Sequence, residues 1–268
     1  MRQPLHKKAR LEKPSVYPER FSVPDDKVDW CSYFGEYRPP YFVAPEILER
    51  FYQNPSEVDP EDCCKIKRPF YSFENKVELD SSNRPRNPRG RTGLAGRGIL
   101  WRWGANLAVD TVLSRLNAET DELELLLINR KDTGELALPG GMVNKGEKIR
   151  EAQEREFEEE TGLKISMEDS ETVYCGYVDD QRNTDNAWME TVASHKHMGS
   201  NQASTLSFRA GDDAENVLWH SLKPELITNL YASHDEIVRL AMYRFYDRCG
   251  GWLTAKTKEQ IEAVIVRQ

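Results

Sequence analysis

Four glutamates stand within five residues near the middle of the chain, Glu156, Glu158, Glu159 and Glu160. On a helix, Glu156, Glu159 and Glu160 are spaced i, i+3 and i+4, so they share one face with Cβ atoms roughly 5–6 Å apart, while Glu158 points elsewhere. Like charges at this distance repel one another. A hard divalent cation such as Mg²⁺, which prefers oxygen ligands, relieves that repulsion. The simpler alternative is a solvated acidic face, which is common on protein surfaces.

The surrounding residues predict the helix that must carry these side chains. Residues 148–160 are mostly strong helix formers, Asn144 suits the N-cap with Glu147 three residues later as in a capping box, and Gly162 suits the C′ position. The apolar residues of this segment fall where they could dock the helix on a sheet, namely Ile149, Ala152 and Phe157.

The spacing around the glutamates resembles a known motif. It runs Gly141, five residues, Glu147, seven residues, Arg155-Glu156-Phe157, one residue, Glu159-Glu160, one residue, Gly162-Leu163. This pattern is similar to the complete Nudix box. The resemblance implies an α/β fold of the Nudix type, an α/β/α sandwich around a mixed sheet with a smaller irregular N-terminal accessory domain. In that fold the box forms a loop-helix-loop that binds Mg²⁺, with Mn²⁺ as a substitute.

The resemblance also implies roles for single residues of the box. Glu156, Glu159 and Glu160 match the metal-ligating glutamates, and the Gly140 or Gly141 backbone is expected close to the metal or the phosphates. Arg155 matches the catalytic helix's supporting arginine, because a guanidinium can orient a carboxylate without competing for the metal.

The implied reaction is attack on phosphorus by a water that the metal activates. Glu160 is the first choice for the residue that accepts the proton of this water. Asp212 and Asp213 are alternatives in a later loop, although a solvated turn explains that pair more readily.

Outside the box the chain resembles the ADP-ribose diphosphatases of mitochondrial type, whose domain also forms the ligand-sensing tail of melastatin-type cation channels. The similar stretches are residues 23–28, 83–98, 177–191, 210–214 and 230–234. The implied activity is hydrolysis of ADP-ribose to AMP and ribose 5-phosphate. Two alternatives are a sensor module that binds ADP-ribose without cleaving it and a Nudix hydrolase of another nucleoside diphosphate derivative.

In that branch, the residues that match Asp180, Arg182, Tyr231 and His234 bind the substrate. An arginine can pair with phosphates, a carboxylate can accept hydrogen bonds from ribose hydroxyls, and an aromatic ring can stack on adenine. Taken without the resemblance, His234 is typical of a helix cap and Tyr231 of ordinary packing.

Composition narrows the range of partners and compartments. The chain has 268 residues and a net charge of −8, which disfavours nucleic acid as a partner because phosphate neutralisation needs a basic surface. No apolar stretch approaches the roughly 18 residues of a membrane span, so no membrane is expected either. Five cysteines without a C-x-x-C pair favour a reducing compartment. We expect a monomer in the cytoplasm, with the mitochondrion as the alternative.

The pattern predicts three parts: a flexible basic tail over residues 1–14, an accessory domain over 15–92 and a Nudix domain over 93–268. Residues 80–91 are rich in turn formers and predict a connector with no buried face. For the arginine-rich stretch 84–97, a connector pinned by scattered ion pairs is favoured slightly over a phosphate site. Strands are expected at residues 123–128, 136–138, 172–178, 187–193 and 217–222, and a turn at residues 131–134 predicts that the first two form a hairpin. Helices are expected at 45–52 and 234–247, the latter with Ile237, Leu240, Ala241 and Phe245 on one face.

Overall fold

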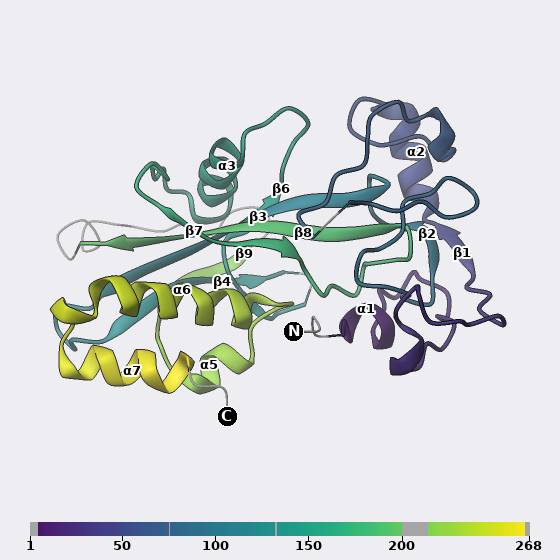
Figure 1. The fold of residues 1–268 in the computed structure, drawn as a ribbon. Coiled ribbons are helices and arrows are strands. Elements are labelled where there is room, and N and C mark those ends of the chain that lie inside the picture. Colours follow the sequence, from purple (N-terminus) through teal and green to yellow (C-terminus); the bar gives the residue numbers. More distant parts are fainter. Residues whose placement is uncertain (1–4, 75, 132, 200–213, 266–268) are drawn as a thin grey trace. The chain divides into compact units, whose positions relative to one another are not determined.

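A computed structural model describes residues 5–74, 76–131, 133–199 and 214–265 of the chain (Figure 1). The chain divides into two compact units. The first comprises Met1–Leu107 and Gly176–Glu190, and the second comprises Ala108–Cys175 and Thr191–Gln268. These units are defined by packing, whereas the boundary near residue 92 was inferred from turn-forming residues and stays a prediction.

The sheet that supports the second unit has seven strands, in the order β5-β4-β3-β8-β7, with β6 paired to β3 and β9 paired to β4. Its strands are β3 (Gly104–Leu116), β4 (Leu123–Arg130), β5 (Leu136–Ala137), β6 (Gly140–Met142), β7 (Glu171–Tyr177), β8 (Ala187–Met198) and β9 (Ala214–Ser221). The expected hairpin is confirmed, because β4 and β5 pair antiparallel. The strands expected at 172–178, 187–193 and 217–222 are confirmed as β7, β8 and β9.

Alternation along β4 builds two cores, one on each face of the sheet. Leu123, Leu125 and Leu127 pack with the helices α6 (His234–Cys249) and α7 (Ala255–Ile265). Leu126 and Ile128 point to the opposite face and pack with Phe157 of α3 (Ile149–Thr161). Helices therefore cover both faces of this unit's sheet, and the predicted α/β/α arrangement is confirmed (Figure 1).

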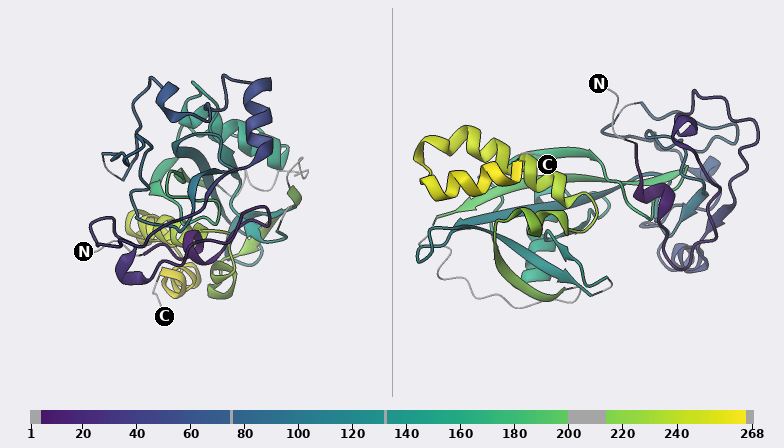
Figure 2. Two further views of the ribbon diagram at one scale, coloured as in Figure 1. Left: turned by 90° about the vertical axis from the view of Figure 1, so that its right-hand side faces the viewer. Right: turned by 90° about the horizontal axis from the view of Figure 1, so that it is seen from below.

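The helix predicted over 234–247 is confirmed as α6, with Ile237, Ala241 and Phe245 buried. Leu240 is only partly buried, because the inward stripe is shifted to include Val238 and Met242. The helix α7 lies along α6 (Figure 2) and adds Ile261 and Val264 to the same core. A short helix, α5 (Pro224–Thr228), also precedes α6.

Strand β3 was missed by the sequence analysis. Polar residues interrupt its apolar pattern, and two of them are buried with partners from β8. Asp110 accepts a hydrogen bond from Thr191, and Ser114 bonds His195 and His197. Because these partners are distant in sequence, period-two alternation does not reveal the strand.

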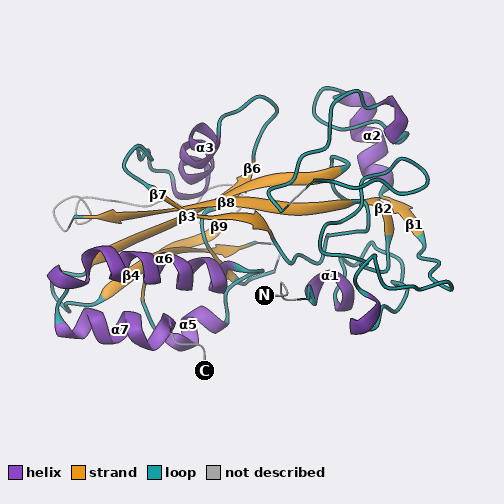
Figure 3. Cartoon of the chain, in the orientation of Figure 1, coloured by secondary structure: helices purple, strands orange, loops and turns teal. Residues whose placement is uncertain are grey.

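The first unit is mostly loop (Figure 3). Its elements are α1 (Lys8–Leu11), η1 (Asp25–Lys27), β1 (Tyr41–Val43), α2 (Pro45–Gln53), η2 (Cys63–Lys65) and β2 (Ala95–Gly98), with β1 and β2 parallel. The helix predicted over 45–52 is confirmed as α2. Pro45 stands in the first turn, where its missing N–H costs nothing.

Two expectations about this unit are wrong. Residues 80–91 do not form a connector without a buried face, because Asn87 and Arg91 are buried. Ion pairs such as Arg89–Glu74 contribute, but Arg91 chiefly donates to the backbone carbonyls of Lys27, Asp29 and Ser32. Main-chain carbonyls left unpaired by irregular structure need donors, and the guanidinium supplies several at once.

The expectation of a flexible tail over residues 1–14 is also wrong for its described residues, 5–14, because several of them are packed into this unit. His6, Ala9 and Arg10 are buried. The ring of His6 bonds the hydroxyl of Tyr177 and the carbonyl of Arg91. Burial lowers the pKa of His6 to about 4, so the ring is neutral at physiological pH. This segment is fixed by hydrogen bonds within the first unit.

Among the described stretches of residues 5–265, no helix combines the length and apolarity needed to span a bilayer. All five cysteines are free thiols.

Phe157 is fully buried and joins α3 to the sheet, so we expect Phe157→Ala to destabilise the protein by about 3–5 kcal/mol, the usual cost of removing a buried aromatic ring. Urea unfolding followed by circular dichroism measures this change. The control is Glu158→Ala on the exposed side of the same helix, expected within about 0.5 kcal/mol of the parent. Equal effects of the two substitutions would contradict the packing described.

Candidate active site

The loop before α3 is placed by the pairing of β6 with β3. In this register Asp110 lies opposite Gly140 and Val109 lies opposite Gly141. A Cβ on Gly140 would stand 2.1 Å from the carbonyl oxygen of Val109, and one on Gly141 would stand 2.2 Å from Oε2 of Glu156. Glycine at position 140 therefore permits the close approach to the strand backbone, and a side chain at position 141 would displace the carboxylate of Glu156.

The helix α3 begins later than the capping prediction placed it. Lys148, not Asn144, is the N-cap, and its N–H donates to Glu151 at 3.3 Å. Asn144 and Glu147 instead close the preceding turn, because the N–H of Asn144 donates to the Glu147 carboxylate at 2.9 Å. The C-terminal prediction is confirmed, since Gly162 ends the helix with φ of 71°, a left-handed conformation that suits glycine.

Arg155 is the hub of the acidic face. Its Nε and Nη2 hold Glu147 bidentately at 2.8 and 2.9 Å, and its Nη1 donates to Glu156 at 2.8 Å and to Glu159 at 3.0 Å. Nη2 also reaches the carbonyl of Met142 at 2.9 Å. The hydrogen bond from Arg155 lowers the pKa of Glu147. Arg155 thus joins the loop before the helix to two of the three expected metal ligands.

Glu160 is the most buried of the three glutamates. Its Oε2 accepts the N–H of Gly140 at 2.8 Å. Burial raises the pKa of Glu160 to about 8, the Gly140 N–H opposes that rise, and the carboxylate of Glu156 adds to it. Burial also raises the pKa of Glu156, against the opposing bond from Arg155. Glu159 differs, because 58% of its side chain is exposed.

These carboxylates suit a hard divalent cation. The raised pKa values of Glu156 and Glu160 mean that nearby groups do not compensate two negative charges here. Within the described residues, no three His, Cys, Asp or Glu side chains converge as a ready-made metal cluster. Their hydrogen bonds explain why: Glu156 and Glu159 accept from Arg155, whereas Glu160 accepts from the N–H of Gly140. Oxygen donors of this kind fit Mg²⁺ or Mn²⁺.

The two residues predicted at 231 and 234 lie in the second unit, with the box. His234 is the first residue of α6, and its Nε2 lies 3.3 Å from Oδ1 of the buried Asp110. The ring of Tyr231 lies under the guanidinium of Arg130 at 4.3 Å and edge-on to His234. Asp110 and Arg130 were missed by the sequence analysis. An aspartate within the apolar run 108–113 was the available signal, since such a residue is seldom buried without a partner.

Asp180 and Arg182 lie in the first unit and pair with each other. Nε and Nη2 of Arg182 donate to the two carboxylate oxygens of Asp180, at 2.8 and 2.6 Å. Asp180 is buried, whereas 29% of the Arg182 side chain is exposed. The hydroxyl of Tyr17 donates to the carbonyl of Arg182, and Arg20 donates to those of Gln181 and Asn183. Asp212 and Asp213, the alternative bases, lie outside the described residues.

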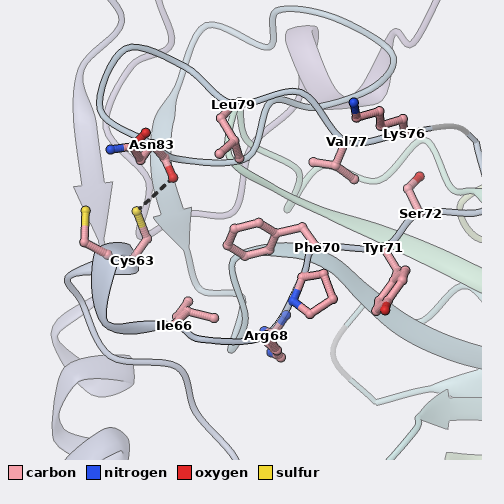
Figure 4. Close-up of a pocket in the computed structure, with 12 residues that line it drawn as sticks. Cys63, Ile66, Arg68, Phe70, Tyr71, Ser72, Lys76, Val77, Leu79 and Asn83 are labelled. Atoms are coloured by element: carbon pink, nitrogen blue, oxygen red, sulfur yellow. Dashed lines mark hydrogen bonds between the residues drawn. The ribbon is translucent and has the colours of Figure 1, made fainter.

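A cavity of about 800 Å³ in the first unit is lined by residues between Cys63 and Asn83. In Figure 4, the ring of Phe70 and the side chain of Leu79 form much of its wall, with Cys63 at one end and Lys76 at the other. None of the site residues predicted from the sequence lines it. The cavity and the acidic face of α3 are therefore separate features of the chain.

Comparison with known proteins agrees with this geometry. A family model described as the NUDIX domain matches residues 107–241, and one described as "NUDT9-like, N-terminal domain" matches residues 23–104. The chain belongs to the Nudix family and carries a NUDT9-like N-terminal domain. Nudix hydrolases generally need a divalent cation.

Three relatives illustrate the range of proteins to which this chain is similar. The chain is 37% identical to a rat protein named "ADP-ribose pyrophosphatase, mitochondrial", over 88% of this chain and 77% of the relative. It is 38% identical to "Putative nudix hydrolase 6" of Caenorhabditis elegans, over 82% of this chain and 89% of the relative. It is 36% identical to a "Transient receptor potential cation channel subfamily M member-like 2" of Nematostella vectensis, over 87% of this chain but 17% of the channel.

The pKa of Glu160 predicts how stability depends on pH in the absence of divalent ions. The folded protein raises this pKa from 4.5 to about 8, so the carboxyl's contribution is fully present below 4.5 and is lost as pH rises through 8. We expect Glu160→Gln to melt above the parent at pH 8 in EDTA, with the gap closing toward pH 5. Thermal unfolding at both pH values measures this.

Glu158→Gln is the matched control, because it removes the same charge from an exposed position of the same helix. A gap of the same size for Glu160→Gln at pH 5 and pH 8 would refute the assignment of the buried charge to Glu160.

Proposed function

We propose that this protein hydrolyses the diphosphate bridge of ADP-ribose to AMP and ribose 5-phosphate, with Mg²⁺ as the ion and Mn²⁺ as a substitute. The observation that carries the reaction type is the acidic face of α3, where Glu156 and Glu160 are crowded against Gly141 and Gly140. The choice of ADP-ribose is supported by the rat relative, which aligns with most of the chain and is named for that substrate.

In this proposal Glu156, Glu159 and Glu160 hold the ion, with the backbone of Gly140 beside it. The bound ion supplies Lewis acidity toward the diphosphate and lowers the pKa of a water. Arg155 keeps Glu156 and Glu159 oriented, since it already bonds both. Glu160 in its ionised form accepts the proton of the attacking water. These roles make Glu160, Glu159, Glu156 and Arg155 the catalytic set.

Asp180, Arg182 and Tyr231 are the proposed substrate-binding residues. Arg182 suits a phosphate, because 29% of its side chain is exposed while Asp180 fixes its orientation. Tyr231 suits the adenine, because an aromatic ring already stacked on a guanidinium is held rigidly enough to stack on a base. The resemblance gives His234 the same role, but both of its ring nitrogens face protein groups, so we assign it no direct contact with the substrate.

Glu159→Gln and Glu160→Gln should each lower Mg²⁺-dependent turnover by at least about 100-fold, more than changes outside the ligand shell usually cost. The measurement is release of AMP and ribose 5-phosphate, resolved by ion-exchange chromatography. Glu158→Gln is the control and should keep the parent's rate. Full turnover in both site variants would remove Glu159 and Glu160 from the mechanism.

The same product assay across ADP-ribose, nucleotide sugars, dinucleoside polyphosphates and oxidised nucleoside triphosphates tests the substrate. ADP-ribose is expected to have the highest kcat/KM, with AMP as a product. Saturable binding of ADP-ribose by calorimetry with no AMP formed would favour the alternative of a sensor module, which the similarity to a channel segment keeps in view. A faster substrate of another class would instead revise the specificity.

We propose that the protein is a monomer. We also propose that it works in a reducing compartment, since all five cysteines are free. The cytoplasm is the expectation from the sequence, and the rat relative's mitochondrial name favours the alternative. Subcellular fractionation with an antibody to the protein distinguishes the two.

A further inference from the structure

A ladder of hydrogen bonds runs from the start of α6 to the loop of the Nudix box. Leu230 forms a parallel β-bridge with Leu136, and the N–H of Tyr231 donates to the Leu136 carbonyl at 2.8 Å. One step further along, the N–H of Leu138 donates to Nδ1 of His234 at 3.0 Å. The imidazole of His234 therefore accepts the next hydrogen bond of the ladder, at the residue where the main chain enters α6.

The bond from Leu138 also fixes the protonation of the ring. Because Nδ1 accepts an N–H, it carries no proton, and the hydrogen of the neutral ring must be on Nε2. Nε2 faces Oδ1 of Asp110 at 3.3 Å. The residue is buried, with 7% of its surface exposed. Both nitrogens of His234 are thus directed at protein atoms.

Both partners are neighbours of Gly140, Leu138 along the chain and Asp110 across the sheet. Leu138 precedes Gly140 by two residues, and Asp110 is the register partner of Gly140 on β3, with Oδ1 only 2.9 Å from where a Gly140 Cβ would be. The N–H of Gly140 in turn donates to Glu160. His234 therefore contacts both of the segments that determine where this N–H points.

We propose that His234 is a positioning residue, which holds the Gly140 N–H against the carboxylate of Glu160 by fixing the loop from Leu138 to Gly140. It acts through this loop and not through contact with the substrate. The effect on turnover rests on the proposed function, because it assumes that Glu160 serves diphosphate cleavage. The effect of His234 on the position of the loop does not depend on that function.

Three substitutions separate the two bonds of the ring. His234→Asn offers an amide oxygen near the place of Nδ1 and keeps an acceptor for Leu138. His234→Gln reaches toward the place of Nε2 and keeps a donor for Asp110. His234→Ala removes both. We expect Ala to lower kcat by about 10- to 100-fold, as changes behind a metal ligand do, with the KM for ADP-ribose nearly unchanged.

Asn should restore most of the lost kcat and Gln should not. His220→Ala, a half-buried histidine of β9 outside the site, is the control and should match the parent. A raised KM at unchanged kcat in the Ala variant would show direct substrate binding and overturn the proposal. Rescue by Gln but not by Asn would also overturn it, because the bond to Leu138 would then be irrelevant.

Amide hydrogen exchange of the folded variants gives a readout that needs no turnover. The amides of Leu138 and Gly140 should exchange faster in His234→Ala than in the parent, and near the parent's rate in His234→Asn. Parent-like exchange at Gly140 in the Ala variant would disprove the positioning role. If the parent itself failed to cleave ADP-ribose, the proposed function would fall, and the exchange rates would still decide the role of His234.

Discussion

Repulsion among carboxylates on one face of α3 is the constraint on which the site depends. A helix that presents Glu156, Glu159 and Glu160 together is destabilised by its own charge unless cations or donors stand beside it. Arg155 provides that charge to two of the three, and the Gly140 N–H provides a donor to the third. Burial still raises the pKa of Glu156 and Glu160, so this compensation is incomplete, and a divalent cation at this face would complete it.

Holding buried carboxylates in place requires a rigid support, and the sheet supplies it. The alternating leucines of β4 join α3 on one face and α6 on the other, so the box helix and the start of α6 are fixed to the same strand. Pairing of β6 with β3 then brings Gly140 against the backbone of Val109 and Gly141 against the carboxylate of Glu156. Core packing and site geometry are therefore one arrangement.

The first unit is held by a different means. With little regular structure, it leaves many main-chain carbonyls without ladder partners, and arginines such as Arg91 and Arg97 bond them several at a time. The loop that contains Asp180 and Arg182 is fixed in the same way, by Tyr17 and Arg20. Hydrogen bonding from guanidinium groups therefore adds to the hydrophobic cluster of Ala44, Ile47 and Val58 in stabilising this unit.

The sequence by itself determined the features that depend on neighbours a few residues away. The box helix, its end at Gly162, the β4–β5 hairpin and α6 all follow from local spacing, because side chains three or four apart on a helix, or alternate along a strand, act on the same surface. Only the tertiary structure decided where Asp110, Arg130 and the imidazole of His234 stand. The burial of Asn87 and Arg91 was decided in the same way. Their partners are tens of residues distant or more, and no local pattern records which distant donor will meet a buried carboxylate.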